Sequence, residues 1–200
     1  MRLEEMERVA GEVVEALAPY CEQIQVAGSV RRRKAEPKDV EVVYRAKMVS
    51  GGLFDAAEFD FLAEPATEGA IGELCRQGFW RFDPEVRRNG PKHKRLIHAE
   101  SGVVVELFRA EEGNWGVILA LRTGPKEFNR VFVTKPWHGG AMPIDMAMRE
   151  GWLWRLGQRL ETPTEEGFFE ALGLPWWEPE GRTGERLVRY LEHGLQDDNG

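Results

Sequence analysis

Residues 24–34 read Ile-Gln-Val-Ala-Gly-Ser-Val-Arg-Arg-Arg-Lys, and residues 39–43 read Asp-Val-Glu-Val-Val. The first stretch predicts a short strand that runs into a tight turn at the glycine and serine, and then a basic turn. The second stretch predicts the next strand. Alternate side chains of a strand point to the same face, so Asp39 and Glu41 share one face and the valines beside them occupy the other. Two neighbouring carboxylates on one face can share bound cations.

A second strand is predicted over residues 103–108, Val-Val-Val-Glu-Leu-Phe, where Glu106 interrupts an apolar run. An unpaired carboxylate among apolar side chains is costly, so Glu106 needs a compensating cation or hydrogen-bond donor. A hard divalent ion with oxygen ligands meets that need. The alternative for Glu106, and for the pair Asp39 and Glu41, is that each acid lies at a strand end and reaches water. The three acids together favour a metal site.

The turn at Gly28 and Ser29 has a feature that suits a phosphate group. Glycine lets the backbone approach a ligand closely, and Arg31 and Arg32 can add charge-assisted hydrogen bonds to phosphate oxygens. A triphosphate would then lie beside the metal ions. The alternative for the basic run is an ordinary solvated surface.

At this point the pattern resembles a known family. Residues 28–32, followed by Asp-Val-Glu at 39–41, resemble the nucleotidyltransferase signature of family X DNA polymerases. Residues 122–129 resemble that family's Phe-Thr-Gly-Ser segment and its downstream asparagine, and residues 164–180 resemble the end of its thumb. The three motifs stand in the order that the family has.

The resemblance implies an α+β fold, with a nucleotidyltransferase (polymerase beta-like) palm of mixed sheet and helices. The palm is expected over residues 1–136, and a small thumb-like C-terminal subdomain over residues 137–200. It also implies metal-dependent nucleotidyl transfer from an NTP or dNTP to a nucleic-acid 3′ end. A minimal DNA polymerase in gap filling or repair is the leading hypothesis.

The resemblance also assigns roles to single residues. Asp39 and Glu41 would bridge two Mg²⁺ ions, with Mn²⁺ as a substitute, and Glu106 would bind the catalytic ion alone. The residues expected to bind the nucleotide are Gly28, Ser29, Arg32, Thr123, Gly124 and Asn129. The family commonly has aspartates at all three acidic positions, so the longer glutamates move the ligand oxygens. Leu121 and Arg122 replace two aromatic residues on the sugar side, which leaves the choice of sugar open.

Two other functions stay open from the sequence. The first is a template-independent nucleotidyltransferase that acts on RNA, a protein or a small molecule, which Glu41 favours because Asp-x-Glu occurs widely among nucleotidyltransferases. The second is a nucleic-acid-binding or partner-binding protein without catalysis, for which Glu106 and Arg122 are the clues.

Composition sets further bounds. The chain has 200 residues with 42% hydrophobic content, which is enough to form a hydrophobic core. Its net charge of −7 argues against indiscriminate nucleic-acid binding. Local basic residues can still contact DNA, and the candidates for such a track are Arg87, Arg88, Lys92, Lys94 and Arg95. The two cysteines form no metal pattern with the histidines, so we expect reduced thiols. No long apolar segment or secretion signal is evident, so we expect a cytoplasmic monomer that does not contact membranes.

Periodicity predicts the remaining elements. We expect an amphipathic helix over residues 3–18 and another over 66–77. A hairpin is expected from the runs 93–98 and 103–108, which would place Glu106 beside the strand of Asp39 and Glu41. Further predictions are an edge strand at 80–82, helices at 114–121, 126–134 and 141–149, a strand at 152–156, a helix capped by Thr164, and a final helix at 185–193.

Overall fold

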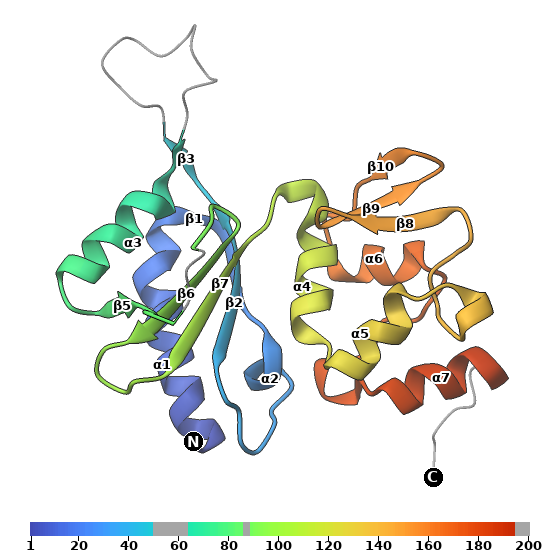
Figure 1. The fold of residues 1–200 in the computed structure, drawn as a ribbon, viewed down its shortest axis with the longest axis horizontal. Helices are drawn as coiled ribbons and strands as arrows, with labels where there is room; N and C mark the ends of the chain where they lie inside the picture. Colours follow the sequence, from blue (N-terminus) through green and yellow to red (C-terminus); the bar gives the residue numbers. More distant parts are fainter. Residues whose placement is uncertain (50–63, 86–88, 195–200) are drawn as a thin grey trace, which may run out of the picture. The chain divides into compact units, whose positions relative to one another are not determined.

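The computed structural model describes residues 1–49, 64–85 and 89–194. Its five-stranded sheet has the order β1-β2-β7-β6-β5 (Figure 1). The central pair β2 and β7 is parallel and the other neighbours are antiparallel, so the sheet is mixed as predicted. The strands are β1 Cys21–Val26, β2 Val40–Ala46, β5 Trp80–Phe82, β6 His93–His98 and β7 Val104–Arg109.

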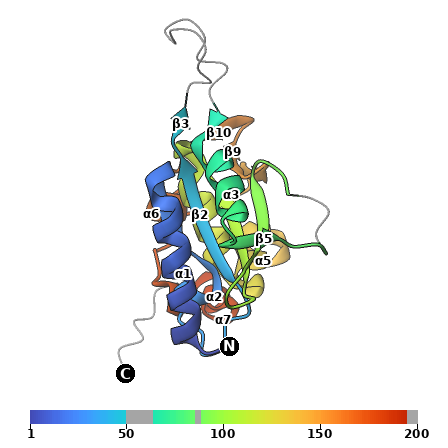
Figure 2. The same ribbon diagram turned by 90° about the vertical axis from the view of Figure 1, so that its left-hand side faces the viewer.

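Two helices, α1 (Leu3–Leu17) and α3 (Ala66–Arg76), cover one face of this sheet (Figures 1 and 2). The apolar positions of α1 recur at helical spacing and are buried, at Met6, Val9, Ala10, Val13 and Leu17. They pack against the alternate valines of β2 and β7. The predicted helices at 3–18 and 66–77 are therefore confirmed.

The predicted hairpin is also confirmed, because β6 and β7 are antiparallel neighbours joined by the turn at 99–103. β7 lies next to β2, as the proposed carboxylate cluster requires. The predicted edge strand β5 is at the edge of the sheet. The shorter elements around this sheet are η1 Ala18–Tyr20, α2 Gly28–Arg31, β3 Met48–Val49 and β4 Glu64–Pro65.

The chain divides by its internal contacts into two compact units. The first unit is Met1–Val30 with Ala35–Ala110, and the second is Arg31–Lys34 with Glu111–Gly200. The division at Glu111 differs in position from the palm and thumb boundary expected at 136, since the helices after residue 114 pack in the second unit. The palm and thumb assignment itself stays a prediction.

The second unit is built from four helices and a three-stranded sheet of order β10-β9-β8. Its core is aromatic, with the ring of Phe132 perpendicular to that of Phe168 at a centroid distance of 5.1 Å. The predicted helices after 114, after 126, after Thr164 and near 185–193 are all present. The elements are η3 Glu112–Asn114, α4 Trp115–Thr123, α5 Lys126–Val133, η4 Pro136–His138, β8 Met146–Arg149, β9 Trp152–Arg155, β10 Gln158–Leu160, α6 Glu165–Ala171, η5 Pro179–Gly181 and α7 Gly184–His193.

The predicted helix at 141–149 is wrong, because its second half forms strand β8 paired with β9. Glu150 and Gly151 both have positive φ, at 54° and 82°, as a tight hairpin turn requires. The turn lets residues 146–149 find their hydrogen-bond partners in β9.

Candidate active site

The face of the five-stranded sheet opposite α1 and α3 carries Glu41 and Glu106. Val40 and Val42 are fully buried in the core beneath α1, so Glu41 between them points to the opposite face. In the parallel register of β2 and β7, Glu41 lies directly beside Glu106. Asp39 comes just before β2, in alternation with Glu41, and is partly exposed. The structure thus brings Glu41 and Glu106 into register, and Asp39 lies in the bend just before β2.

Glu106 already has a cationic partner within the fold. Nη1 of Arg95 donates a hydrogen bond of 2.9 Å to Oε1 of Glu106, its register partner across β6 and β7. Nε2 of His93 is 3.9 Å from Oε2 of Glu106. The compensating group beside the partly buried Glu106 is therefore a guanidinium. Among the described residues, no three Asp, Glu, His or Cys side chains are grouped closely enough to hold a metal ion.

Arg95 is in turn fixed by Asp83, which follows β5. Nε of Arg95 donates to Oδ2 of Asp83 at 2.8 Å, and Asp83 is only 6% exposed. The hydrogen bond from Arg95 is the main reason that the pKa of Asp83 lies below its usual range, so this carboxylate keeps its charge. Asp83, Arg95 and Glu106 thus form a hydrogen-bonded row across the sheet, and Glu41 is the next residue in register beyond Glu106.

Gly28 is packed against this row. The tight turn predicted at residues 28–29 is the start of the short helix α2, and Gly28 has φ +63°. A Cβ atom at this position would collide with the carboxylate of Glu41, so a larger residue would displace that side chain as well as strain the backbone. The next residue, Ser29, has a buried hydroxyl with no hydrogen-bond partner among the described residues. An unpaired buried hydroxyl is available to a ligand oxygen.

The other predicted nucleotide-binding residues lie in the second unit and contact one another there. Nη1 of Arg31 donates to Oγ1 of Thr123 at 2.7 Å, and Nη1 of Arg32 donates to the carbonyl oxygen of Thr123. The amide of Asn129 donates to the carbonyls of Leu121 at 2.6 Å and Gly124 at 2.9 Å. Asn129 therefore also has a structural task, which is to bond the carbonyls at the end of α4.

Glu165 is the functional candidate that sequence reasoning missed. This carboxylate, 3% exposed, accepts two hydrogen bonds of 2.9 Å from Arg31 and one of 2.6 Å from Arg182. Nε1 of Trp176 donates a further bond at 3.1 Å. Acids are ordinary in the first turn of a helix, so no local pattern distinguishes Glu165 from other acids. Its role is to fix the arginine that follows the glycine-serine turn.

The predicted DNA track is only partly on the surface. Arg87 and Arg88 lie outside the described residues, and Lys92 is exposed. Lys94 is buried, with its ammonium group 3.0 Å from Glu68 and 3.1 Å from the carbonyl of Gly90. Arg95 is turned toward Asp83 and Glu106, as described above. In this structure, therefore, Lys94 and Arg95 serve internal partners.

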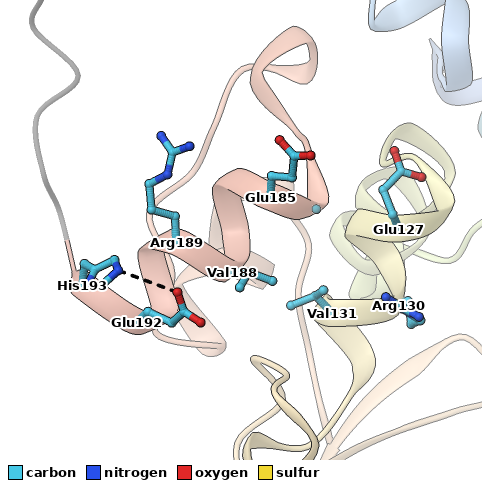
Figure 3. Close-up of a pocket in the computed structure, with 9 residues that line it drawn as sticks. Glu127, Arg130, Val131, Glu185, Val188, Arg189, Glu192 and His193 are labelled. Atoms are coloured by element: carbon cyan, nitrogen blue, oxygen red, sulfur yellow. Dashed lines mark ion pairs between the residues drawn. The ribbon is translucent and has the colours of Figure 1, made fainter.

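A groove of about 560 Å³ lies between α5 and α7 of the second unit (Figure 3). Val131 and Val188 point toward each other across it, and charged residues of both signs surround them. Among the described residues, those that line it include none of the predicted site residues. They are Glu127, Arg130, Val131, Gly184, Glu185, Val188, Arg189, Glu192 and His193.

Comparison with known proteins places the fold. No protein-family model and no curated protein matches this sequence. Among solved structures, the chain is similar to polymerase beta from Leishmania infantum in a ternary P/T complex, with a TM-score of 0.65 and 17% identity. The match covers 92% of this chain and 76% of that chain. The chain has a polymerase beta-like fold.

That fold confirms the predicted α+β class with a polymerase beta-like architecture. Membership in family X stays a prediction, since an identity of 17% carries the fold alone. Within the part of the chain that the structure describes, no helix has the length and apolar character needed to cross a membrane.

Proposed function

We propose that this protein is a metal-dependent nucleotidyltransferase that transfers a nucleotide from an NTP or dNTP to a nucleic-acid 3′ end. The observation that carries the proposal is the register of Glu41 beside Glu106 on the sheet face opposite α1, with Gly28 packed against Glu41. The polymerase beta-like fold supports it. The finer proposal is a DNA polymerase of the gap-filling or repair type.

The chemistry of the donors suits hard divalent cations, although the described residues contain no preformed group of three metal ligands. Asp39, Glu41 and Glu106 carry carboxylate oxygens, and such ligands suit Mg²⁺ or Mn²⁺. Asp39 and Glu41 would hold both ions and Glu106 would hold one. Bound ions of this kind lower the pKa of an attacking hydroxyl and neutralise charge on the phosphates.

The chain's own residues would do the remaining work. The buried hydroxyl of Ser29 would donate to a phosphate oxygen, which is the partner that it lacks among the described residues. Arg32 would add positive charge next to the phosphates. By the resemblance, Thr123 and Gly124 would contact the sugar and Asn129 the base. These assignments are proposals.

Primer extension tests the function. The full chain is mixed with Mg²⁺ or Mn²⁺, each nucleotide, and a labelled primer that is single-stranded, recessed or next to a gap. Extension with the templated nucleotide on recessed or gapped DNA supports the polymerase. Addition that ignores the template supports a template-independent transferase. The absence of any addition with both metals, on every substrate, would contradict the proposal.

Replacing Gly28 with alanine tests the packing of the glycine against Glu41. We expect the rate of nucleotide addition to fall about 10- to 100-fold, because the added methyl group displaces the Glu41 carboxylate. Gly78→Ala is the matched control, since Gly78 has φ +76° but open space around its Cβ position. Both variants carry the same backbone strain, of about 1 kcal/mol. Equal rates for the two variants would contradict the assignment of Glu41.

A further inference from the structure

We propose that Asp83 and Arg95 are positioning residues that hold Glu106. In this arrangement the guanidinium of Arg95 competes with any divalent ion for the Glu106 carboxylate. The inference rests on the proposed function, because it takes Glu106 as a metal ligand. It goes beyond that function in saying what controls the affinity of the site for its metal. Neither Asp83 nor Arg95 would touch the substrate.

The geometry lets Arg95 serve both acids at the same time. Its Nε donates to Asp83 at 2.8 Å, and its Nη1 donates to Oε1 of Glu106 at 2.9 Å. The two acids use different N–H groups of one planar guanidinium, so neither hydrogen bond has to break for the other to form. Arg95 is also the register partner of Glu106 in the sheet, so the backbone holds the pair in place.

Asp83 is the anchor of the arrangement. The backbone N–H of Glu85 donates to Oδ1 of Asp83 at 3.0 Å, while Oδ2 receives Arg95. Asp83 is almost fully buried, and its pKa lies below the usual range, mainly because of the hydrogen bond from Arg95. The same hydrogen bond is the main reason that the pKa of Arg95 is raised. This pair is therefore charged and fixed, unlike an exposed ion pair.

The carboxylate of Glu106 would therefore be shared between Arg95 and a bound metal ion. Its Oε1 accepts from Arg95, and the guanidinium charge opposes a second cation nearby. Glu41 lies beside Glu106 in the register, so the effect of Arg95 reaches the adjacent ligand as well. Asp83 draws part of the guanidinium toward itself, which limits how strongly Arg95 holds Glu106.

Opposite changes in metal affinity follow from these contacts. Arg95→Gln removes the competing charge and keeps an amide that can donate to Asp83, so the affinity for Mn²⁺ should rise about tenfold. Asp83→Asn removes the anchor charge and leaves Glu106 as the acid that Arg95 contacts, so the affinity should fall by about threefold or more. An ordinary orienting role for Arg95 predicts a loss of affinity in both variants.

The experiment measures Mn²⁺ binding to the full chain by the paramagnetic resonance signal of the free ion. It is done without nucleotide at about pH 8, above the ordinary pKa of the histidine beside Glu106. Arg155→Gln is the matched control, because Arg155 makes the same type of bond to Asp145, at 2.7 Å, in the other unit. We expect no change in Mn²⁺ affinity for this control.

Each single variant leaves one charge of the Asp83–Arg95 pair without its partner, which could weaken the fold. The double variant, Asp83→Asn with Arg95→Gln, removes both charges and avoids this effect. It should bind Mn²⁺ more tightly than the wild type, as Arg95→Gln alone does. Unchanged or weaker binding in both Arg95 variants overturns the inference. Mn²⁺ binding that is insensitive to Glu106→Gln overturns the metal role of Glu106, and with it this inference. If Glu106→Gln weakens binding but the Arg95 variants leave it unchanged, only the inference fails.

Discussion

Glu41→Gln is expected to lower the rate of nucleotide addition by about a thousandfold, since a carboxylate assigned to both metal ions would lose its charge where phosphate charge must be neutralised. The substitution keeps the shape of the side chain, which lies on the sheet face opposite α1 and outside the core beneath α1. The fold should therefore persist. The measurement is single-turnover primer extension with Mg²⁺, together with thermal unfolding of the same sample.

The matched control is Glu22→Gln, since Glu22 is an exposed acid in strand β1 of the same sheet. It removes the same charge from the same unit and should leave the rate within about twofold of the wild type. If Glu41→Gln retains the full rate of addition, the carboxylate row of this sheet is not the active site. If both variants slow equally, a general charge effect explains the loss.

Much of the fold was predictable because its elements have strong periodicity. The valines of β2 and β7 alternate with Glu41 and Glu106, and that alternation fixes which face each acid occupies. Helix α1 repeats its apolar residues every three or four positions. The predicted helix at 141–149 was wrong because a Glu-Gly turn is a weak hairpin pattern, so the pairing of β8 with β9 was not evident.

The basic run at 92–95 shows why a surface patch cannot be predicted from a run of basic residues in the sequence alone. Residues of a strand alternate between faces, so Lys94 and Arg95 cannot both join one surface patch. Lys94 points to the core side and pairs with Glu68, whereas Arg95 points to the opposite face and pairs with Glu106. A basic run on a strand is divided between two faces, and the sequence alone does not give the partner on either face.

The ion-pair partner of Arg31 could not be predicted either, because it is distant in the sequence. Arg31 follows the glycine-serine turn, and its carboxylate partner Glu165 comes 134 residues later. Nothing local to either residue indicates the pairing. Two arginines and a tryptophan share this one buried acid, so the cluster has a larger role in stability than any surface ion pair.

Glu165→Ala is expected to destabilise the second unit by about 3–5 kcal/mol, because it leaves the guanidiniums of Arg31 and Arg182 buried without their shared counterion. The side chain of Arg182 is fully buried, so water cannot compensate it. Denaturant unfolding followed by tryptophan fluorescence measures the loss, since Trp176 donates directly to Glu165. Glu166→Ala, at the exposed neighbour in the same helix, is the control and should change stability by less than about 0.5 kcal/mol.

The pH dependence gives the second arm of this test. Burial by itself raises the pKa of Glu165, but the hydrogen bonds from Arg182 and Arg31 outweigh it and set the pKa below the ordinary value of 4.5. A folded-state pKa below the unfolded one means that protons favour unfolding. The advantage of the wild type over Glu165→Gln should therefore be full at neutral pH and shrink as the pH falls below about 4.5. A difference between the two that stays constant across this range would mean that packing, and not the charge of Glu165, holds the cluster together.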